Sequence, residues 1–186
     1  MRNKMRILEN RASLSLEERF EGVELLQDVT DDDLSWLPDG HAGEDYGYEA
    51  FMAGVGAILM GRRTHDVVAG FGTDWPYGDT PVLVATHRPL DTDEPSVSAV
   101  SGAPAELVAG ARAVAGDRDV YVDGGVLIQQ LVDAGLVDEL IVTVIPVDLG
   151  EGIPLLAGEG QWALLQLEES REFPSGVEQR WYRRSA

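Results

Sequence analysis

Three short motifs in the sequence carry residue types that bind phosphate. Each follows a short apolar run typical of a buried strand, and two of them open a helical pattern. Arginine and threonine donate hydrogen bonds to phosphate oxygens, glycine lets a ligand approach the backbone, and a helix N-terminus attracts anions. The motifs are Gly-Arg-Arg-Thr at 61–64, Thr-His-Arg at 86–88 and Asp-Gly-Gly at 123–125. Taken singly, each has a plainer explanation: exposed arginines, a polar loop, or a tight turn that needs glycine.

Arg62 and Arg63 stand in the first turn of the helix predicted for 62–72. The helix dipole is already positive there, so cations at this place are unfavourable. An anion between the arginines and the helix would remove the conflict, and the hydroxyl of Thr64 could also bind it. The pair therefore favours a bound anion over two solvated side chains.

Predicted strands and helices alternate through the middle of the chain. The strands are expected at 5–16, 56–61, 80–86, 97–101, 119–124 and 137–147, with a terminal antiparallel pair at 162–173 and 176–184; the helices are expected at 45–55, 62–72, 103–116 and 125–135. The acidic segment 17–44 carries turn signals and predicts loops and short helical turns. This order predicts one α/β domain over 1–186, with a mixed, mostly parallel sheet and antiparallel C-terminal strands. Ligands of open α/β sheets bind at the carboxyl ends of the strands, so the three motifs together predict a dinucleotide lying across that edge.

The composition excludes several classes of function. Acidic residues number 33 against 14 basic ones, which gives a net charge of −19 and a surface that repels nucleic acid and anionic membranes. No apolar run is long enough to span a bilayer, and the N-terminal stretch does not resemble a signal peptide. The absence of cysteine excludes disulfides and favours the cytoplasm, while the three scattered histidines lack metal-ligand spacing. The acid excess, with Lys4 as the single lysine, suits a salt-adapted or a high-GC organism.

The segments "LMGRRTHD", "VLVATHR" and "VYVDGGVLIQQLVDAGLVDELIVTVIPVDLGEGIPLL", in this order, resemble the dihydrofolate reductase-like family. They are most similar to the stand-alone relatives of the reductase domain of riboflavin biosynthesis. The resemblance covers about residues 45–184. It implies a three-layer α/β/α fold, NADPH as cofactor, a small-molecule substrate and a homodimer.

The resemblance also assigns roles to the three motifs. It implies that Gly61, Arg62, Arg63 and Thr64 bind the cofactor phosphates, and that Thr86, His87 and Arg88 surround the adenosine 2′-phosphate. The third motif and the start of the helix predicted at 125–135 would line the pyrophosphate and nicotinamide half of the cofactor. These residues are Asp123, Gly124, Gly125, Val126, Leu127 and Ile128. The Gly-Gly peptide bond is cis in reductases of the folate branch, so a cis Gly124–Gly125 bond is a further hypothesis.

The substrate end of the site is less well matched. Relatives begin with a strand that ends in Ser-Leu-Asp-Gly, whereas this chain has Ser15-Leu16-Glu17-Glu18. Ser15 and Glu17 are therefore the expected substrate contacts near the N-terminus, with Glu17 as a candidate catalytic carboxylate. The longer acid and the lost glycine depart from the family pattern, which indicates either an atypical substrate or an N-terminal end that has lost its function.

A second acid lies fifteen residues before Met60. Asp45 stands at the spacing where folate-reducing relatives carry the acid that supports protonation of the substrate, and a partly buried carboxylate could do so here. The alternative is that Asp45 caps a helix. Trp36 and Tyr48 could stack on a flat heterocycle, although aromatic residues at helical spacing more often belong to the core.

The predicted function is that of an NADPH-dependent reductase acting on a small pterin- or pyrimidine-like heterocycle. A first alternative is a nucleotide-binding module without turnover, favoured by the changed residues at 17 and 18. A second is the riboflavin-pathway reductase of a ribosylamino-uracil phosphate. That substrate needs another phosphate site, for which only Arg112 and Arg118 are unassigned in the middle of the chain.

Overall fold

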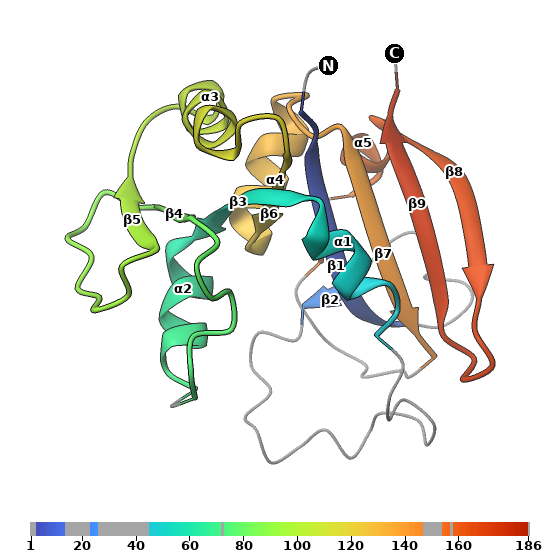
Figure 1. Ribbon diagram of the computed structural model, residues 1–186. Helices are drawn as coiled ribbons and strands as arrows, with labels where there is room; N and C mark the ends of the chain where they lie inside the picture. Colours follow the sequence, from blue (N-terminus) through green and yellow to red (C-terminus); the bar gives the residue numbers. More distant parts are fainter. Residues whose placement is uncertain are drawn as a thin grey trace.

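The computed structural model describes residues 3–13, 23–25, 45–71, 73–146, 154–156 and 158–185. Nine strands and five helices lie within these ranges (Figure 1). The strands are β1 Met5–Ser13, β2 Val23–Leu25, β3 Val55–Gly61, β4 Val82–Ala85, β5 Val97–Val100, β6 Asp119–Asp123, β7 Glu139–Ile145, β8 Leu165–Glu172 and β9 Glu178–Arg184. The helices are α1 Tyr48–Ala53, α2 Arg62–Ala69, α3 Pro104–Ala115, α4 Gly125–Asp133 and α5 Glu159–Trp162.

All nine strands join one sheet, in the order β5-β4-β3-β6-β1-β7-β9-β8, with β2 paired to β1. The six strands from β5 to β7 run parallel, whereas β9 is antiparallel to β7 and β8 is antiparallel to β9. The predicted mixed sheet with antiparallel C-terminal strands is therefore confirmed.

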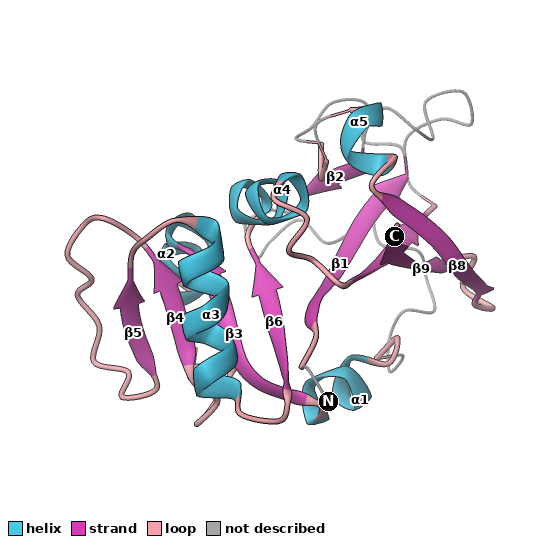
Figure 2. Ribbon diagram, turned by 90° about the horizontal axis from the view of Figure 1, so that it is seen from above, coloured by secondary structure: helices cyan, strands magenta, loops and turns pink. Residues whose placement is uncertain are grey.

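Helices cover both faces of the sheet (Figure 2). Leu107 and Val108 of α3 and Leu131 of α4 pack on one face, in the larger hydrophobic cluster. Phe51 of α1 packs on the opposite face, in a second cluster that also holds Met60 of β3. Strand β3 lies between these layers, and six of its seven residues are buried, which explains the unbroken apolar run in the sequence. The predicted three-layer α/β/α arrangement is confirmed.

Two short elements differ from the sequence prediction. Strand β2, Val23–Leu25, lies in the acidic segment 17–44, where loops and helical turns were expected. It pairs antiparallel with the end of β1, a contact that local turn signals do not reveal. Helix α5 occupies Glu159–Trp162, so the strand expected from residue 162 begins at Leu165 instead. In the described part of the chain, no helix combines the length and apolar character required to cross a membrane.

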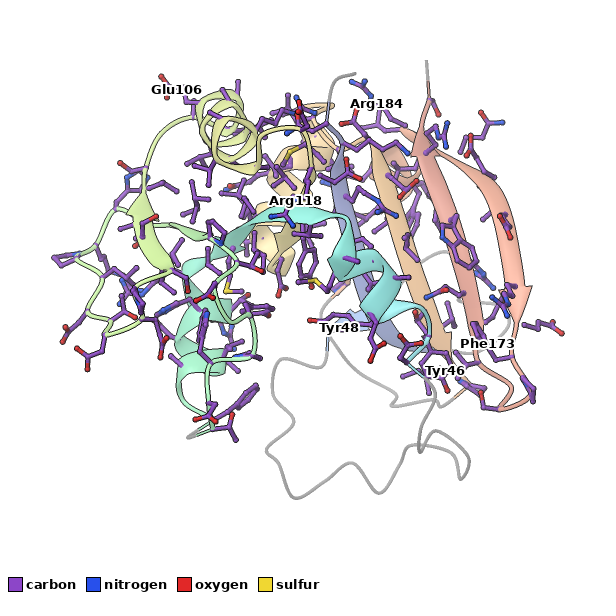
Figure 3. All side chains as sticks on the ribbon, in the orientation of Figure 1. Tyr46, Tyr48, Glu106, Arg118, Phe173 and Arg184 are labelled. Atoms are coloured by element: carbon purple, nitrogen blue, oxygen red, sulfur yellow. The ribbon has the colours of Figure 1, made fainter. Side chains whose placement is uncertain are left out.

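Asp138 joins three parts of the chain just before β7 begins. Its Oδ2 accepts hydrogen bonds from the backbone N–H of Met5, at 2.9 Å, and from Nη2 of Arg112, at 2.7 Å. Its Oδ1 lies 3.6 Å from Nη2 of Arg184. Arg184 is at the opposite end of the molecule from Tyr46 and Tyr48 (Figure 3). Arg112, unassigned from the sequence, thus stabilises the amino-terminal edge of the sheet.

Candidate functional site

A cleft of about 440 Å³ lies at the carboxyl edge of the parallel strands. Residues of all three motifs border it: the four residues 61–64, then Thr86 and His87, then Gly124 and Gly125 with the start of α4. Three predicted cofactor residues, Arg88, Asp123 and Ile128, do not border the cleft directly. Segments more than 60 residues apart in sequence therefore meet in one depression, as the alternating pattern predicts.

Strand pairing explains why the motifs meet. Strand β3 lies between β4 and β6 and is parallel to both. Its last residue, Gly61, pairs with Ala85, next to the second motif. Met60 pairs with Asp123, next to the Gly-Gly turn. The motifs are thus held side by side by the ladders of three buried strands.

The Gly-Gly turn packs directly on the beginning of α2. Gly124 has a φ of +109°, a conformation that residues with a side chain rarely adopt. A Cβ on Gly124 would lie 2.8 Å from Oγ1 of Thr64 and 3.2 Å from the backbone nitrogen of Gly61. Glycine is therefore required at 124 by the packing of the protein on itself, before any ligand is considered.

The hypothesis of a cis Gly124–Gly125 bond is wrong, because no peptide bond in the described residues is cis. The positive φ of Gly124 turns the chain from β6 into α4 with trans bonds.

Two helices start at the cleft, and neither has a side-chain cap. Gly61 precedes α2 and Gly124 precedes α4, and glycine has no side chain with which to cap a helix. The first N–H groups of a helix have no partner within it, and they carry the positive end of its dipole. Gly125, Val126 and Leu127 border the cleft in the first turn of α4. This arrangement suits an anionic ligand.

The two arginines of the first motif have different surroundings. Arg62 donates from Nε to Oδ1 of Asp66, at 2.7 Å, and from Nη1 to the carbonyl of Pro89, at 2.8 Å. A protein carboxylate thus offsets the charge of Arg62, so the sequence argument that a ligand must offset both arginines was too strong. Arg63 borders the cleft. Arg88, three residues after the end of β4, has a side chain that is 72% exposed.

The carboxylate of Asp123 directly precedes the Gly-Gly turn and faces a tyrosine from another segment. The hydroxyl of Tyr77 is 3.5 Å from Oδ2 of Asp123. Burial, and after it the negative charge of Asp123, raises the pKa of Tyr48, which is 41% exposed on α1. Asp123 was predicted only as a cofactor contact, and Tyr77 was not predicted at all. Tyr77 and Asp123 can both exchange protons, and Asp123 adjoins Gly124, which borders the cleft.

Asp45 has the contacts of a helix cap. Its Oδ1 accepts the N–H of Gly47, at 2.9 Å, and its Oδ2 accepts the N–H of Glu49, at 3.0 Å. These bonds, that from Gly47 first, lower the pKa of the exposed Asp45 carboxyl. The catalytic role of Asp45 stays a prediction. Ser15, Glu17 and Trp36 lie outside the described residues.

Some residues that border the cleft were missed in the sequence. Ser101 and Gly102 follow β5, the strand beyond β4, and extend the same wall. They could have been found, because they also follow a predicted parallel strand. Gln129 and Gln130 of α4 also border the cleft. Their contribution depends on the direction in which α4 leaves the turn, which a sequence pattern does not specify.

Comparisons with known proteins agree with this architecture. A family model described as the RibD C-terminal domain matches residues 35–178. The protein of Bacillus subtilis (strain 168) named "Uncharacterized protein YwjB" is 28% identical over 153 residues, which are 82% of this chain and 88% of that protein.

Solved structures are similar over the whole chain. The crystal structure of a "Putative riboflavin biosynthesis protein" from Shewanella sp. PV-4 has a TM-score of 0.76 at 28% identity and covers 98% of this chain and 99% of its own. Dihydrofolate reductase from Enterococcus faecalis, complexed with NADP(H) and RAB-propyl, has a TM-score of 0.57 at 15% identity and covers 100% of both chains. The second similarity shows the dihydrofolate reductase-like fold alone, whereas the family match supports a reductase. On the family model and the shared fold, the chain belongs to the RibD C-terminal domain family.

Proposed function

We propose that the protein is an NADPH-dependent reductase that transfers a hydride to a small pterin- or pyrimidine-like heterocycle. The observation that supports this most is the cleft at which the three motifs meet. It gathers two helix N-termini and Arg63 in a chain whose net charge is −19. A dinucleotide phosphate is the ligand that such a concentration of donors suits.

The residues at the cleft fit the parts of a dinucleotide. Gly124, Gly125 and Thr64 would hold the pyrophosphate, and Thr86 and His87 would hold the 2′-phosphate. The exposed Arg88 follows these two residues in the chain and would reach the same phosphate from outside the cleft lining. Val126 exposes 74% of its surface at the cleft, an unusual fraction for valine, and would contact an apolar part of the ligand. NADPH supplies the hydride when bound, and the protein orients it and excludes water.

We propose Asp123, which directly precedes the Gly-Gly turn and lies 3.5 Å from the hydroxyl of Tyr77, as the group that exchanges a proton with the substrate. We expect Asp123→Asn to lower the rate constant of hydride transfer by about 10²-fold or more, the range found for general acids. We expect Asp45→Asn to lower it less than about twofold, since a neutral cap replaces a charged one. Single-turnover oxidation of NADPH by each variant measures both effects. The reverse order would assign the proton to Asp45, as first predicted from the sequence.

Arg88 is the residue expected to distinguish NADPH from NADH. Arg88→Ala should weaken NADPH binding by about 1.5–3 kcal/mol, the usual contribution of a hydrogen bond to a charged group. The affinity for NADH, which lacks the 2′-phosphate, should change by less than about 0.5 kcal/mol. Isothermal titration of both nucleotides measures this, with Arg118→Ala as a control outside the cleft. Equal losses for the two nucleotides would contradict the assignment of Arg88.

Stopped-flow oxidation of bound NADPH by a panel of pterins, pyrimidines and aldehydes tests the reductase itself. Saturable oxidation by a heterocycle supports the proposal. Tight binding of NADPH with no oxidation by any member of the panel favours the nucleotide-binding module instead.

The riboflavin-pathway substrate has less support from the described residues. Its phosphate needs a second basic site, but Arg112 is paired with Asp138 at the amino edge. Arg118 lies beside β3 (Figure 3), and neither arginine borders the cleft. The homodimer and the cytoplasmic location also stay predictions. Sedimentation velocity tests the first.

A further inference from the structure

Asp66 lies at the centre of a polar cluster beside the cleft. Its Oδ1 accepts a hydrogen bond from Nε of Arg62 at 2.7 Å and lies 3.3 Å from Nδ1 of the buried His65. Its Oδ2 lies 4.0 Å from Nη2 of Arg88. Loss of hydration alone would raise the pKa of Asp66, but the hydrogen bonds from Arg62 and His65 lower it overall. The carboxylate is therefore ionised at neutral pH; it binds Arg62 by a hydrogen bond and lies near the exposed Arg88 of another segment.

Arg62 links this cluster to the loop after β4. Its Nη1 donates to the carbonyl of Pro89, one residue beyond the second motif. Pro89 has no N–H, so its carbonyl is the only backbone group through which this residue can be held. Within the loop, Oγ1 of Thr86 accepts the N–H of Arg88 at 3.1 Å. Asp66 orients the guanidinium of Arg62, and this guanidinium fixes the loop at Pro89. Thr86 fixes the beginning of the same loop through its bond to Arg88.

The geometry points to a positioning role for Arg62 and Asp66, which we propose form a clamp on residues 86–90. The clamp holds the loop in the shape that presents Thr86, His87 and Arg88 to a phosphate monoester. Asp66 thereby raises the selectivity for a dinucleotide with a 2′-phosphate, without touching it. This inference rests on the proposed function, since it concerns the 2′-phosphate end of the same cleft.

A purely electrostatic view predicts the opposite effect of Asp66. A carboxylate 4.0 Å from Arg88 repels a phosphate dianion and competes for the arginine, so its removal should tighten binding. If Asp66 instead keeps the loop in shape, its removal should weaken binding, although one negative charge has gone. The sign of the effect therefore distinguishes the two views.

NADP⁺ and NAD⁺ differ only by the 2′-phosphate, so their affinities test the clamp by titration calorimetry without turnover. We expect Asp66→Asn to weaken NADP⁺ binding about tenfold, a loss of about 1.4 kcal/mol, and NAD⁺ binding less than about twofold. Asp66→Glu, which keeps the carboxylate, should recover most of the selectivity. Asp91→Asn removes the same charge from an exposed position near the loop and should change neither affinity by more than about twofold. Equal or tighter NADP⁺ binding by Asp66→Asn would overturn the clamp.

The double variant Arg62→Ala/Asp66→Asn completes the test. When two residues act as one unit, the losses of binding free energy in the single variants do not add. The double variant should therefore bind NADP⁺ no more weakly than whichever single variant binds it less tightly. Additive losses would contradict a joint role. A variant that merely destabilises the protein would lower the affinities for both nucleotides equally and leave the ratio of the two affinities unchanged. If the unmodified protein binds neither nucleotide, both the proposed function and the clamp are wrong. If the protein binds NADP⁺ and Asp66→Asn tightens that binding, only the clamp is wrong.

Discussion

Gly124→Ala is expected to lower the free energy of unfolding by about 2–4 kcal/mol, the sum of a strained φ and an overpacked contact. The new methyl group would lie 2.8 Å from Oγ1 of Thr64, and alanine strongly disfavours the φ of +109° found here. The turn can accommodate the methyl group only by moving away from α2. Dinucleotide binding should therefore be lost even at temperatures where the variant is folded.

Gly61→Ala is the matched control for unfolding. Gly61 has an ordinary φ of −68°, and a Cβ there would lie no closer than 3.8 Å to other atoms. Its free energy of unfolding should stay within about 0.5 kcal/mol of the unmodified protein. Urea unfolding of both variants measures the difference, and equal destabilisation would show that the close contact at Gly124 is not what requires glycine.

Asp138→Ala is expected to lower the free energy of unfolding by about 1–3 kcal/mol, the range for leaving a partly buried hydrogen-bond partner unsatisfied. Arg112 has a side chain only 13% exposed, and it would keep its charge after losing a partner at 2.7 Å. The N–H of Met5 would lose its acceptor in the same variant. Because the site is at the other edge of the sheet, NADPH affinity of the folded variant should be unchanged.

Glu168→Ala is the control for this prediction. Glu168 pairs with Arg183 at 3.1 Å, but the two side chains are 44% and 53% exposed. Exposed pairs of this kind contribute about 0–1 kcal/mol. Urea unfolding measures the loss of stability in both variants. Similar losses in the free energy of unfolding would mean that the burial of Arg112 does not determine how much stability is lost.

Much of the fold could be predicted because the signals were local. The apolar run 56–61 identified the central strand, since a strand buried on both faces has no polar alternation. Glycines and arginines at the ends of such runs then located the motifs. Only the parallel order of the strands was needed to bring them to one edge.

The remaining features depend on contacts between distant segments. Asp66 stands four residues after Arg62, a spacing visible in the sequence, but the bond from Arg62 to Pro89 spans 27 residues. Tyr77 and Asp123 are 46 residues apart, and no local pattern marks them as partners. Arg112 was left without a role because its partner, Asp138, lies 26 residues further along the chain, just before β7. The cis bond was inferred from relatives, whereas the turn itself needs only a glycine with positive φ.

Titration of NADPH into ¹⁵N-labelled protein tests most directly whether the cleft binds this cofactor. The account predicts saturable shifts of amide signals at the three motifs, residues 61–64, 86–88 and 124–127, with little change in β8 and β9. The absence of saturable shifts, or shifts centred away from these motifs, would contradict it.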